Sequence, residues 1–311
     1  MTSVDETAGV VATQAQRGPR LHWPRGDMWW RHLVGIVALI FAGFPVAYVI
    51  SAAFNADSTL SGASLIPREV TTDNFKQLFS QGDQLQNTSN AANYGHWYIN
   101  TLIIAGATAI LSVMLGAMAA YAFSRFRFRG RRMGMVALLL IQMFPQLLLA
   151  VAIYLIVLNV GNLFHAIGLN TLTGLIIVYL GGVMSINVWL MKGFFDTIPR
   201  ELDESARVDG ATPAQIFWGV VLPLAAPVLV VIALISFIGV INEFVIASVI
   251  LQNNDKWTLA IGLRQFVNEQ YSTHWGPFAA GVVLAAIPVV VLFMALQKFI
   301  VHGLTGGAVK G

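Results

Sequence analysis

Long apolar stretches alternate with shorter polar segments along most of this chain. Six stretches hold about 20 or more residues that are mostly apolar and nearly free of charge, which is the length that a helix needs to cross a bilayer. This pattern predicts an all-α, polytopic membrane protein with six transmembrane helices, at residues 33–54, 100–124, 133–160, 171–195, 224–250 and 278–301.

The same pattern divides the chain into successive parts. Residues 1–31 are polar and mixed in charge, which is typical of a flexible cytoplasmic tail, and residues 32–54 form the first transmembrane helix. Residues 55–99 predict an external loop with a short helix that starts at Thr72 or Asp73. Residues 100–301 predict a five-helix core that contains a polar hairpin at 196–223, and residues 302–311 predict a cytoplasmic C-terminal tail.

Composition and charge agree with a membrane protein and set its orientation. The chain is 57% hydrophobic and 11% charged, which is more apolar surface than one soluble core can bury. Fourteen of the 18 Lys and Arg residues fall in the two tails, the loop between the second and third spans, and the hairpin. The positive-inside rule therefore places both termini and the hairpin in the cytoplasm.

That topology explains why the chain has more basic than acidic residues, so no nucleic-acid partner is needed to explain its positive net charge. Arg125, Arg127 and Arg129 alternate with phenylalanines between two spans, which predicts a membrane anchor whose arginines face lipid phosphates. Membrane lipid is thus the expected partner of this segment.

The hairpin has the residues that two short capped helices require. Pro199 favours the start of the first helix, and an Asp203–Arg207 pair at i,i+4 is expected to support its solvent face. Gly210 suits the left-handed conformation past a helix end, and residues 212–215, Thr-Pro-Ala-Gln, predict a capping box with proline at the first helical position. The alternative is an ordinary loop between two spans.

The hairpin also resembles the signature of the permease subunits of binding-protein-dependent ABC importers, Glu-Ala-Ala, three residues, Gly, nine residues, Ile-x-Leu-Pro. Ser205 and Val220 replace an alanine and the isoleucine, and the spacing is intact. The resemblance implies that this hairpin docks on an ATPase subunit. The implied contact residues are Glu204, Ser205, Ala206, Asp209, Gly210, Leu222 and Pro223.

A narrower resemblance covers the chain from about residue 64 to its end. Residues 143–145 (Met-Phe-Pro), 193–199, 209–213, 275–280 and the tail 303–311 look like the MalG-type permeases of maltose and maltodextrin importers. This resemblance implies the type I ABC importer permease fold in a bacterial cytoplasmic membrane. It also implies four kinds of partner: a second, MalF-type permease, two ATPase subunits that bind ATP and Mg, an extracytoplasmic solute-binding protein, and lipid.

Two further segments acquire roles from the same resemblance. The tail is implied to contact the ATPases through Gly306, Gly307 and Lys310. Asn253, Asn254 and Asp255 follow the fifth span and favour a short projecting turn. By position they resemble the loop that helps to displace sugar from the binding protein, and the alternative is a plain solvated turn.

Polar residues inside the predicted spans are costly in a bilayer and usually face the bundle interior or a water-filled path. Gln142 and Gln146 lie at i,i+4 around a proline on the third span, and Asn187 and Asn242 lie in the fourth and fifth. They are candidates for a translocation path, or for hydrogen bonds between helices of this chain and its partner permease. For Glu243, the one acidic residue within a predicted span, the second role is favoured.

No phosphate-binding loop, catalytic triad or paired histidine is present in the sequence, so we expect no catalysis, no metal and no cofactor in this chain. The predicted function is the permease subunit of an importer for maltose, maltodextrin or a related α-glucoside, driven by ATP hydrolysis in partner subunits. The alternatives are a permease for trehalose, another disaccharide or a polyol, and a stand-alone channel or ion-coupled transporter.

Overall fold

The structure is a computed structural model that describes residues 29–56, 66–67, 69–79, 93–267 and 274–305. The chain separates into two units, residues 1–46 and 47–311, and the boundary falls within the first helix. Apart from one isolated bridge between Asn55 and Val70, the regular structure of the described residues is helical. The all-α prediction is therefore confirmed.

Five helices in the described part of the chain are long and apolar enough to cross a membrane, and a bent pair of helices supplies a sixth candidate. The first of the five is α1 (Trp29–Phe54), which carries Pro45 in its interior and begins a few residues before the predicted span. Its last residues belong to the second unit, which holds the other candidates.

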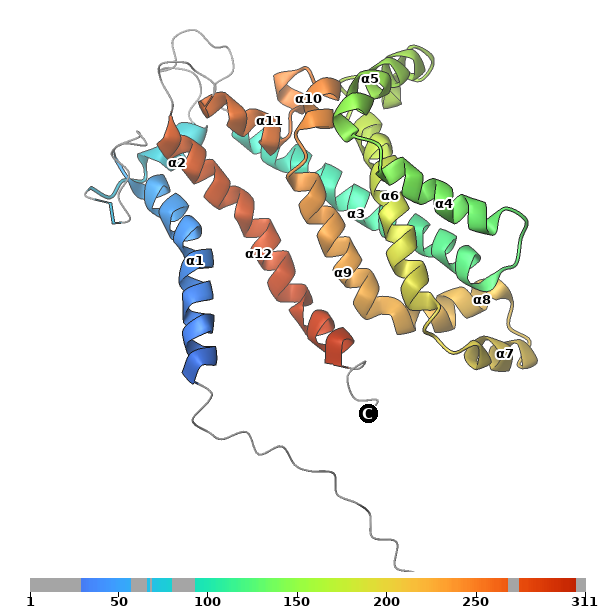
Figure 1. Ribbon diagram of the computed structural model, residues 1–311. Coiled ribbons are helices and arrows are strands. Elements are labelled where there is room, and N and C mark those ends of the chain that lie inside the picture. The colour runs from blue at the N-terminus through green and yellow to red at the C-terminus, as the bar shows by residue number, and fades with distance from the viewer. Residues whose placement is uncertain (1–28, 57–65, 68, 80–92, 268–273, 306–311) are drawn as a thin grey trace, which may run out of the picture. The chain divides into compact units, whose positions relative to one another are not determined.

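Three long helices form the centre of the second unit: α3 (Tyr94–Arg125), α6 (Leu172–Phe195) and α9 (Leu222–Ile241). They lie side by side, and α12 (Trp275–Thr305) packs against α9 (Figure 1). The neighbouring helices approach α3 closely because the residues of α3 at the contact are small. They include the buried alanines Ala105, Ala109, Ala117 and Ala120.

The third predicted span, 133–160, is not one straight helix. It consists of α4 (Arg131–Gln142) and α5 (Gln146–Leu163), which meet at an angle of 105°. Pro145 lies at this break in an extended conformation and has no N–H for the helical ladder, while the residue before a proline disfavours helix. The residues of the third predicted span therefore form a bent pair of helices, which is the sixth candidate span of the described chain.

The fifth predicted span, 224–250, is also interrupted. α9 ends at Ile241, and a separate helix, α10 (Val245–Ile250), follows after a short break. Both carboxylate oxygens of Glu243 accept hydrogen bonds from the first turn of α10, from the N–H groups of Ile246 (2.8 Å) and Ala247 (3.0 Å). The carboxylate thus replaces the backbone partners that the start of a helix lacks.

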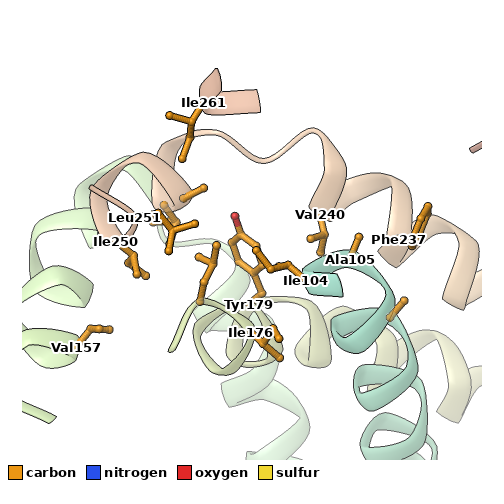
Figure 2. Packing of buried hydrophobic residues seen from close by; sticks show 14 of the residues in the cluster. Ile104, Ala105, Val157, Ile176, Tyr179, Phe237, Val240, Ile250, Leu251 and Ile261 are labelled. Carbon is orange, nitrogen blue, oxygen red and sulfur yellow. The ribbon is translucent and has the colours of Figure 1, made fainter. Parts of the chain in front are cut away.

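α10 packs against α5 and α6 in a buried apolar cluster, and η3 (His165–Ile167) links α5 to α6. Figure 2 shows Tyr179 of α6 in the middle of this cluster, between Ile104 of α3, Val240 of α9 and Leu251. The Tyr179 hydroxyl donates a hydrogen bond to Glu243. The break after α9 is therefore held in place by both apolar packing and a charge-assisted hydrogen bond.

A second group of short elements lies at the same end of the unit, with α2 (Asp73–Phe79), η5 (Asn254–Lys256), α11 (Leu259–Arg264) and η6 (Gln265–Val267). The prediction of a short helix from Thr72 or Asp73 is confirmed. α2 packs against α12, and a side chain at Gly276 would come within 2.4 Å of Asn74. That glycine is required by the close approach of the two helices.

α12 continues through Thr305, so the helix runs past the predicted boundary at residue 301. The predicted N-terminal tail up to residue 28 and the C-terminal residues Gly306, Gly307 and Lys310 lie outside the described residues.

Candidate coupling site at the α7–α8 hairpin

The predicted hairpin is formed by α7 (Arg200–Val208) and α8 (Pro213–Ile216), which lie at the end of the unit opposite α10 and α11 (Figure 1). Gly210 turns the chain between them with a φ of +84°, and its N–H donates to the carbonyl of Arg207 (3.0 Å). Only a residue without Cβ adopts this conformation at little cost. The predicted helix stop at Gly210 is confirmed.

The capping box at the start of α8 is also confirmed. The N–H of Thr212 donates to Oε1 of Gln215 (2.8 Å), and the N–H of Gln215 donates to the Thr212 hydroxyl (3.3 Å). α8 then continues through a π-helical turn, η4 (Phe217–Val221), into α9. A displacement of α8 is therefore passed directly to a transmembrane helix, without an intervening loop.

A buried ion pair attaches α7 to the end of α3. Nε of Arg125 lies 2.8 Å from Oδ2 of Asp203, and both side chains are less than 5% exposed. Nη2 of Arg125 also donates to the carbonyl of Ile198 (3.1 Å), just before α7. A charge pair this deeply buried fixes the relative position of its two helices, because separating it leaves a charge without water or a counterion.

Two predictions are corrected by this pair. Asp203 does not pair with Arg207 on the solvent face, because its side chain points to the bundle, where Arg125 neutralises it. Arg125 does not face lipid phosphates, since it is buried in that same contact, whereas Arg127 and Arg129 are exposed.

A second set of polar contacts surrounds the first. The Ser124 hydroxyl donates to Oδ1 of Asp196 (2.6 Å), Nζ of Lys192 lies 2.5 Å from Oδ2 of the same carboxylate, and Nη2 of Arg200 donates to the Ser124 carbonyl (3.3 Å). Burial acts to raise the pKa of Asp196, but the hydrogen bonds from Lys192 and Ser124, with the charges of Lys192 and Arg131, outweigh it and lower the pKa. Asp196 is therefore a stable anion at the end of α6.

The apolar side of the hairpin completes its attachment. Ile198, Ile216, Phe217 and Val221 are buried in a cluster with Phe195 of α6 and with residues of α3. The hydroxyl of Tyr121 on α3 donates to the carbonyl of Pro213 (3.3 Å). The hairpin is therefore a rigid extension of the helix bundle and not a hanging loop.

The opposite side of the hairpin is open. Glu204, Ser205, Asp209 and Gly210 are exposed, together with Val208, whose side chain is 88% exposed. An apolar side chain between two carboxylates, on a rigid and capped element, is typical of a protein-docking surface.

The remaining three predicted contact residues lie elsewhere on the hairpin. Ala206 is half-buried against the bundle, Leu222 is half-buried at the start of α9, and Pro223 follows it, exposed. The structure thus brings together four of the seven predicted coupling residues on one open surface.

The predicted path residues do not share one surface. Asn187 is 2% exposed, and its amide donates to the hydroxyls of Ser112 on α3 (3.2 Å) and Ser236 on α9 (3.0 Å). It therefore joins three helices of its own chain. Asn242 is exposed at the end of α9, and its amide donates to the Ile238 carbonyl one turn back (2.9 Å).

The two glutamines of the third span belong to different helices. Gln142 ends α4, is exposed and donates to the carbonyl of Gly182 on α6 (2.6 Å). Gln146 begins α5 beyond the bend, and its side chain lies outside the described part. The two glutamines therefore lie on opposite sides of the 105° break, on different helices of the third span.

The polar loop after α10 is partly anchored. Nε1 of Trp97 on α3 donates to both Oδ1 and the carbonyl oxygen of Asn254 (2.9 Å each), and Nδ2 of Asn100 donates to the carbonyl of Asp255 (2.9 Å). The side chains of Asn253 and Asp255 are exposed. Two of the three predicted loop residues are therefore accessible, whereas Asn254 holds the loop on α3.

Some of these anchors were not found from the sequence. Asn170 has a φ of 57°, and its Oδ1 accepts hydrogen bonds from the N–H groups of Gln252 (2.6 Å) and Asn253 (2.9 Å). An asparagine tolerates this left-handed conformation better than most residues. The sequence held only weak signs of the Arg125–Asp203 pair. Arg125 lies at the end of an apolar span, and Asp203 lies three residues before Ala206 on the same helix. No sequence pattern specified that these two charges would meet.

Comparison with known proteins agrees with this geometry. Residues 112–306 match the family described as binding-protein-dependent transport system inner membrane component. The chain is 38% identical to the galactooligosaccharides transport system permease protein GanQ of Bacillus subtilis (strain 168), over 90% of this chain and 94% of that protein. It is also 38% identical to the maltose/maltodextrin transport system permease protein MalG of Escherichia coli (strain K12), over 90% of this chain and 95% of that protein.

Among solved structures, a chain of a bacterial ABC transporter involved in the import of the acidic polysaccharide alginate is similar, with a TM-score of 0.69 and 25% identity, over 89% of this chain and 98% of that one. The MetNI methionine ABC transporter has the same fold, with a TM-score of 0.52 and 18% identity. The chain belongs to the family of inner-membrane permease components of binding-protein-dependent transport systems, and the predicted permease fold is confirmed.

Proposed function

We propose that this chain is one of two permease subunits in an ABC importer that carries an oligosaccharide across a bacterial cytoplasmic membrane. The observation that carries the proposal is the open surface of a hairpin that turns at a left-handed glycine, has a capping box at its second helix and is attached to three helices of the bundle. Such an element transmits force, whereas a channel or an ion-coupled transporter has no use for it.

The partners follow from the same proposal. A second, MalF-type permease completes the path, two ATPase subunits bind ATP and Mg and hydrolyse the nucleotide, and an extracytoplasmic protein delivers the solute. Both termini and the hairpin lie in the cytoplasm, as the distribution of Lys and Arg indicates. The C-terminal tail contacts the ATPases through Gly306, Gly307 and Lys310, and no group bound to this chain takes part in chemistry.

The coupling step is a movement of the hairpin together with the helices to which it is attached. Glu204 and Asp209 present carboxylates to the ATPase, and Val208 presents an apolar contact between them. When the ATPase subunits close, α8 pulls on α9 through the π-turn, and α7 pulls on α3 through the buried ion pair. Exposed Gln142 and Asn242 line the path, and exposed Asn253 and Asp255 reach toward the binding protein.

The substrate is proposed as maltose or maltodextrin, and a galactooligosaccharide is the second candidate. The galactooligosaccharide is kept as a candidate because the chain is 38% identical both to a galactooligosaccharide permease and to a maltose/maltodextrin permease. Uptake of radiolabelled maltotriose and galactobiose by the reconstituted importer with its own binding protein separates the two. Trehalose uptake without maltotriose uptake would contradict the maltose and maltodextrin proposal and favour the trehalose alternative.

Gly210 provides the test of coupling. The space around its α-carbon is open, so a side chain there meets no neighbour, and the cost of Gly210→Val arises from the left-handed backbone, about 1–2 kcal/mol. We expect Gly210→Val to reduce uptake at least tenfold while basal ATP hydrolysis continues. Gly210→Asn is the matched control, because asparagine tolerates φ > 0, and it should retain most of the uptake. Normal uptake with Gly210→Val would contradict the assignment.

A further inference from the structure

A groove of about 710 Å³ lies at the hairpin end of the second unit, between the α3–α4 turn, the first turn of α4 and α6. Its lining includes Phe128, Arg131, Arg132, Met133, Trp189 and Lys192. The proposed coupling and transport steps use none of these side chains to bind a partner or solute. The groove therefore needs an explanation of its own.

The groove carries more positive charge than its surroundings neutralise. Lys192 forms an ion pair with Asp196, and the charge of Arg131 also attracts the Asp196 carboxylate. This single carboxylate cannot neutralise both cations. Arg132 is exposed and makes no ion pair with any described residue. Arg131 and Arg132 are consecutive residues directly after a left-handed glycine, Gly130 with φ +90°, and both line the groove, where they can donate to a phosphate.

Apolar surface continues directly from this charged rim. Met133, Val136 and Leu140 follow at helical spacing on one face of α4 and are 79%, 47% and 60% exposed. A ligand that matches the rim and this face has an anionic head and a hydrocarbon chain. Neither a free anion nor an apolar molecule covers both.

An amphipathic aromatic side chain marks the level of the membrane interface between these two regions. Trp189 is 38% exposed, and its Nε1 donates to the Met135 carbonyl (3.1 Å), which fixes the indole between α6 and α4. Tryptophan is enriched where the hydrocarbon region of a bilayer meets the headgroups. The basic rim therefore lies at headgroup depth and the apolar face of α4 at acyl-chain depth.

We propose that this groove binds an anionic phospholipid, with its phosphate on Arg131 and Arg132 and an acyl chain along Met133, Val136 and Leu140. The site lies beyond the proposed transport function and does not depend on the identity of the sugar. The bound lipid holds the start of α4 against α6, next to the Lys192–Asp196 contact at the base of the hairpin. Basic pockets between transmembrane helices are a known kind of anionic-lipid site.

The test compares two charge-matched variants of the complete importer by native mass spectrometry. Dioleoyl phosphatidylglycerol is titrated against dioleoyl phosphatidylcholine. Arg131→Gln/Arg132→Gln removes the phosphate contacts, and Arg127→Gln/Arg129→Gln removes two charges from the same turn outside the groove. At about fivefold per basic residue, the first variant should bind phosphatidylglycerol about 25-fold more weakly. The second should lose less than about fivefold, because Arg127 and Arg129 are exposed and meet lipid phosphates outside the groove.

A second measurement uses the wild-type importer, so that the proposal does not depend on the folding of a variant. A photoactivatable phosphatidylglycerol should label peptides that contain residues 128–140 or 189–192, and excess inorganic phosphate should not displace it. Equal loss of binding in both variants would indicate general electrostatic attraction and overturn the site. Displacement by phosphate would overturn the lipid proposal in favour of a free-anion site. Absence of label would overturn it as well, because it would mean that the partner permease and not lipid covers the groove.

Discussion

Removal of one partner of the buried charge pair between Arg125 and Asp203 should loosen the attachment of the hairpin to the bundle. We consider Asp203→Leu, Arg125→Met and the double variant, since leucine and methionine fill similar space without charge. Each single variant leaves the other charge buried without its partner, which costs about 3–5 kcal/mol. The lower end applies here, because Arg125 Nε is 2.8 Å from Asp203 Oδ2 without hydrogen-bond alignment and Asp203 Oδ1 has no hydrogen-bond partner among the described residues.

A cost of about 3 kcal/mol corresponds to an increase of about 150-fold in the equilibrium constant for local opening of α7. Arg125→Met should be somewhat worse than Asp203→Leu, because it also removes the donor to the Ile198 carbonyl, worth about 1 kcal/mol. The double variant should recover most of the loss, because an apolar pair of similar volume is often as stable as a buried ion pair.

Hydrogen exchange of the purified importer measures this opening directly. Amides of residues 201–208 should exchange about 150-fold faster in each single variant, whereas those of residues 278–290 in α12 should not change. Arg200→Met is the matched control, since Arg200 is exposed and its one bond to the Ser124 carbonyl is long, 3.3 Å, so the effect should stay below about fivefold. Sugar-stimulated ATP hydrolysis should fall with the loss of protection.

Two results would refute this reasoning. Exchange within threefold of the wild type in both single variants would show that the pair does not hold the hairpin. A double variant as damaged as the sum of the single ones would show that Arg125 and Asp203 do not interact in the folded protein.

The remaining predictions concern the loop and the end of α6. Asn254→Ala should lower the melting temperature of the importer slightly, because it removes one of the two acceptors of the Trp97 indole N–H, worth at most about 1 kcal/mol, while the backbone carbonyl of residue 254 remains. Asn253→Ala should leave stability unchanged and reduce uptake. The pKa of Asp196 is lowered, so its contacts stabilise the protein fully above the ordinary carboxyl pKa of 3.8 and are lost as the pH falls through the lower folded value. The difference in melting temperature between wild type and Asp196→Asn should therefore be constant from pH 7 to about pH 5 and shrink below about pH 4; a constant difference at still lower pH would contradict the lowered pKa.

The sequence determined the class of fold and the local shape of the hairpin. Long apolar windows require helices in a bilayer, because every backbone polar group must be bonded within its own segment. Gly210 and the Thr212–Gln215 box act within four residues of themselves, so their spacing was enough to predict a left-handed turn and a capped helix. The predicted helix from Asp73 was correct for the same local reason.

Tertiary structure decided where the polar side chains of the bundle point and where two of the spans break. Asp203 had a cation one turn away in Arg207 and another 78 positions earlier in Arg125, and packing of α7 on α3 selected the distant one. An average over apolar residues cannot show that Pro145 turns the third span through 105°, or that Glu243 ends the fifth span by capping α10, because a hydropathy pattern reports affinity for the membrane and not helical continuity. Local propensity thus set the elements, and only the packed neighbours determined which buried charges and amides pair, since partners distant in sequence leave no periodic signal.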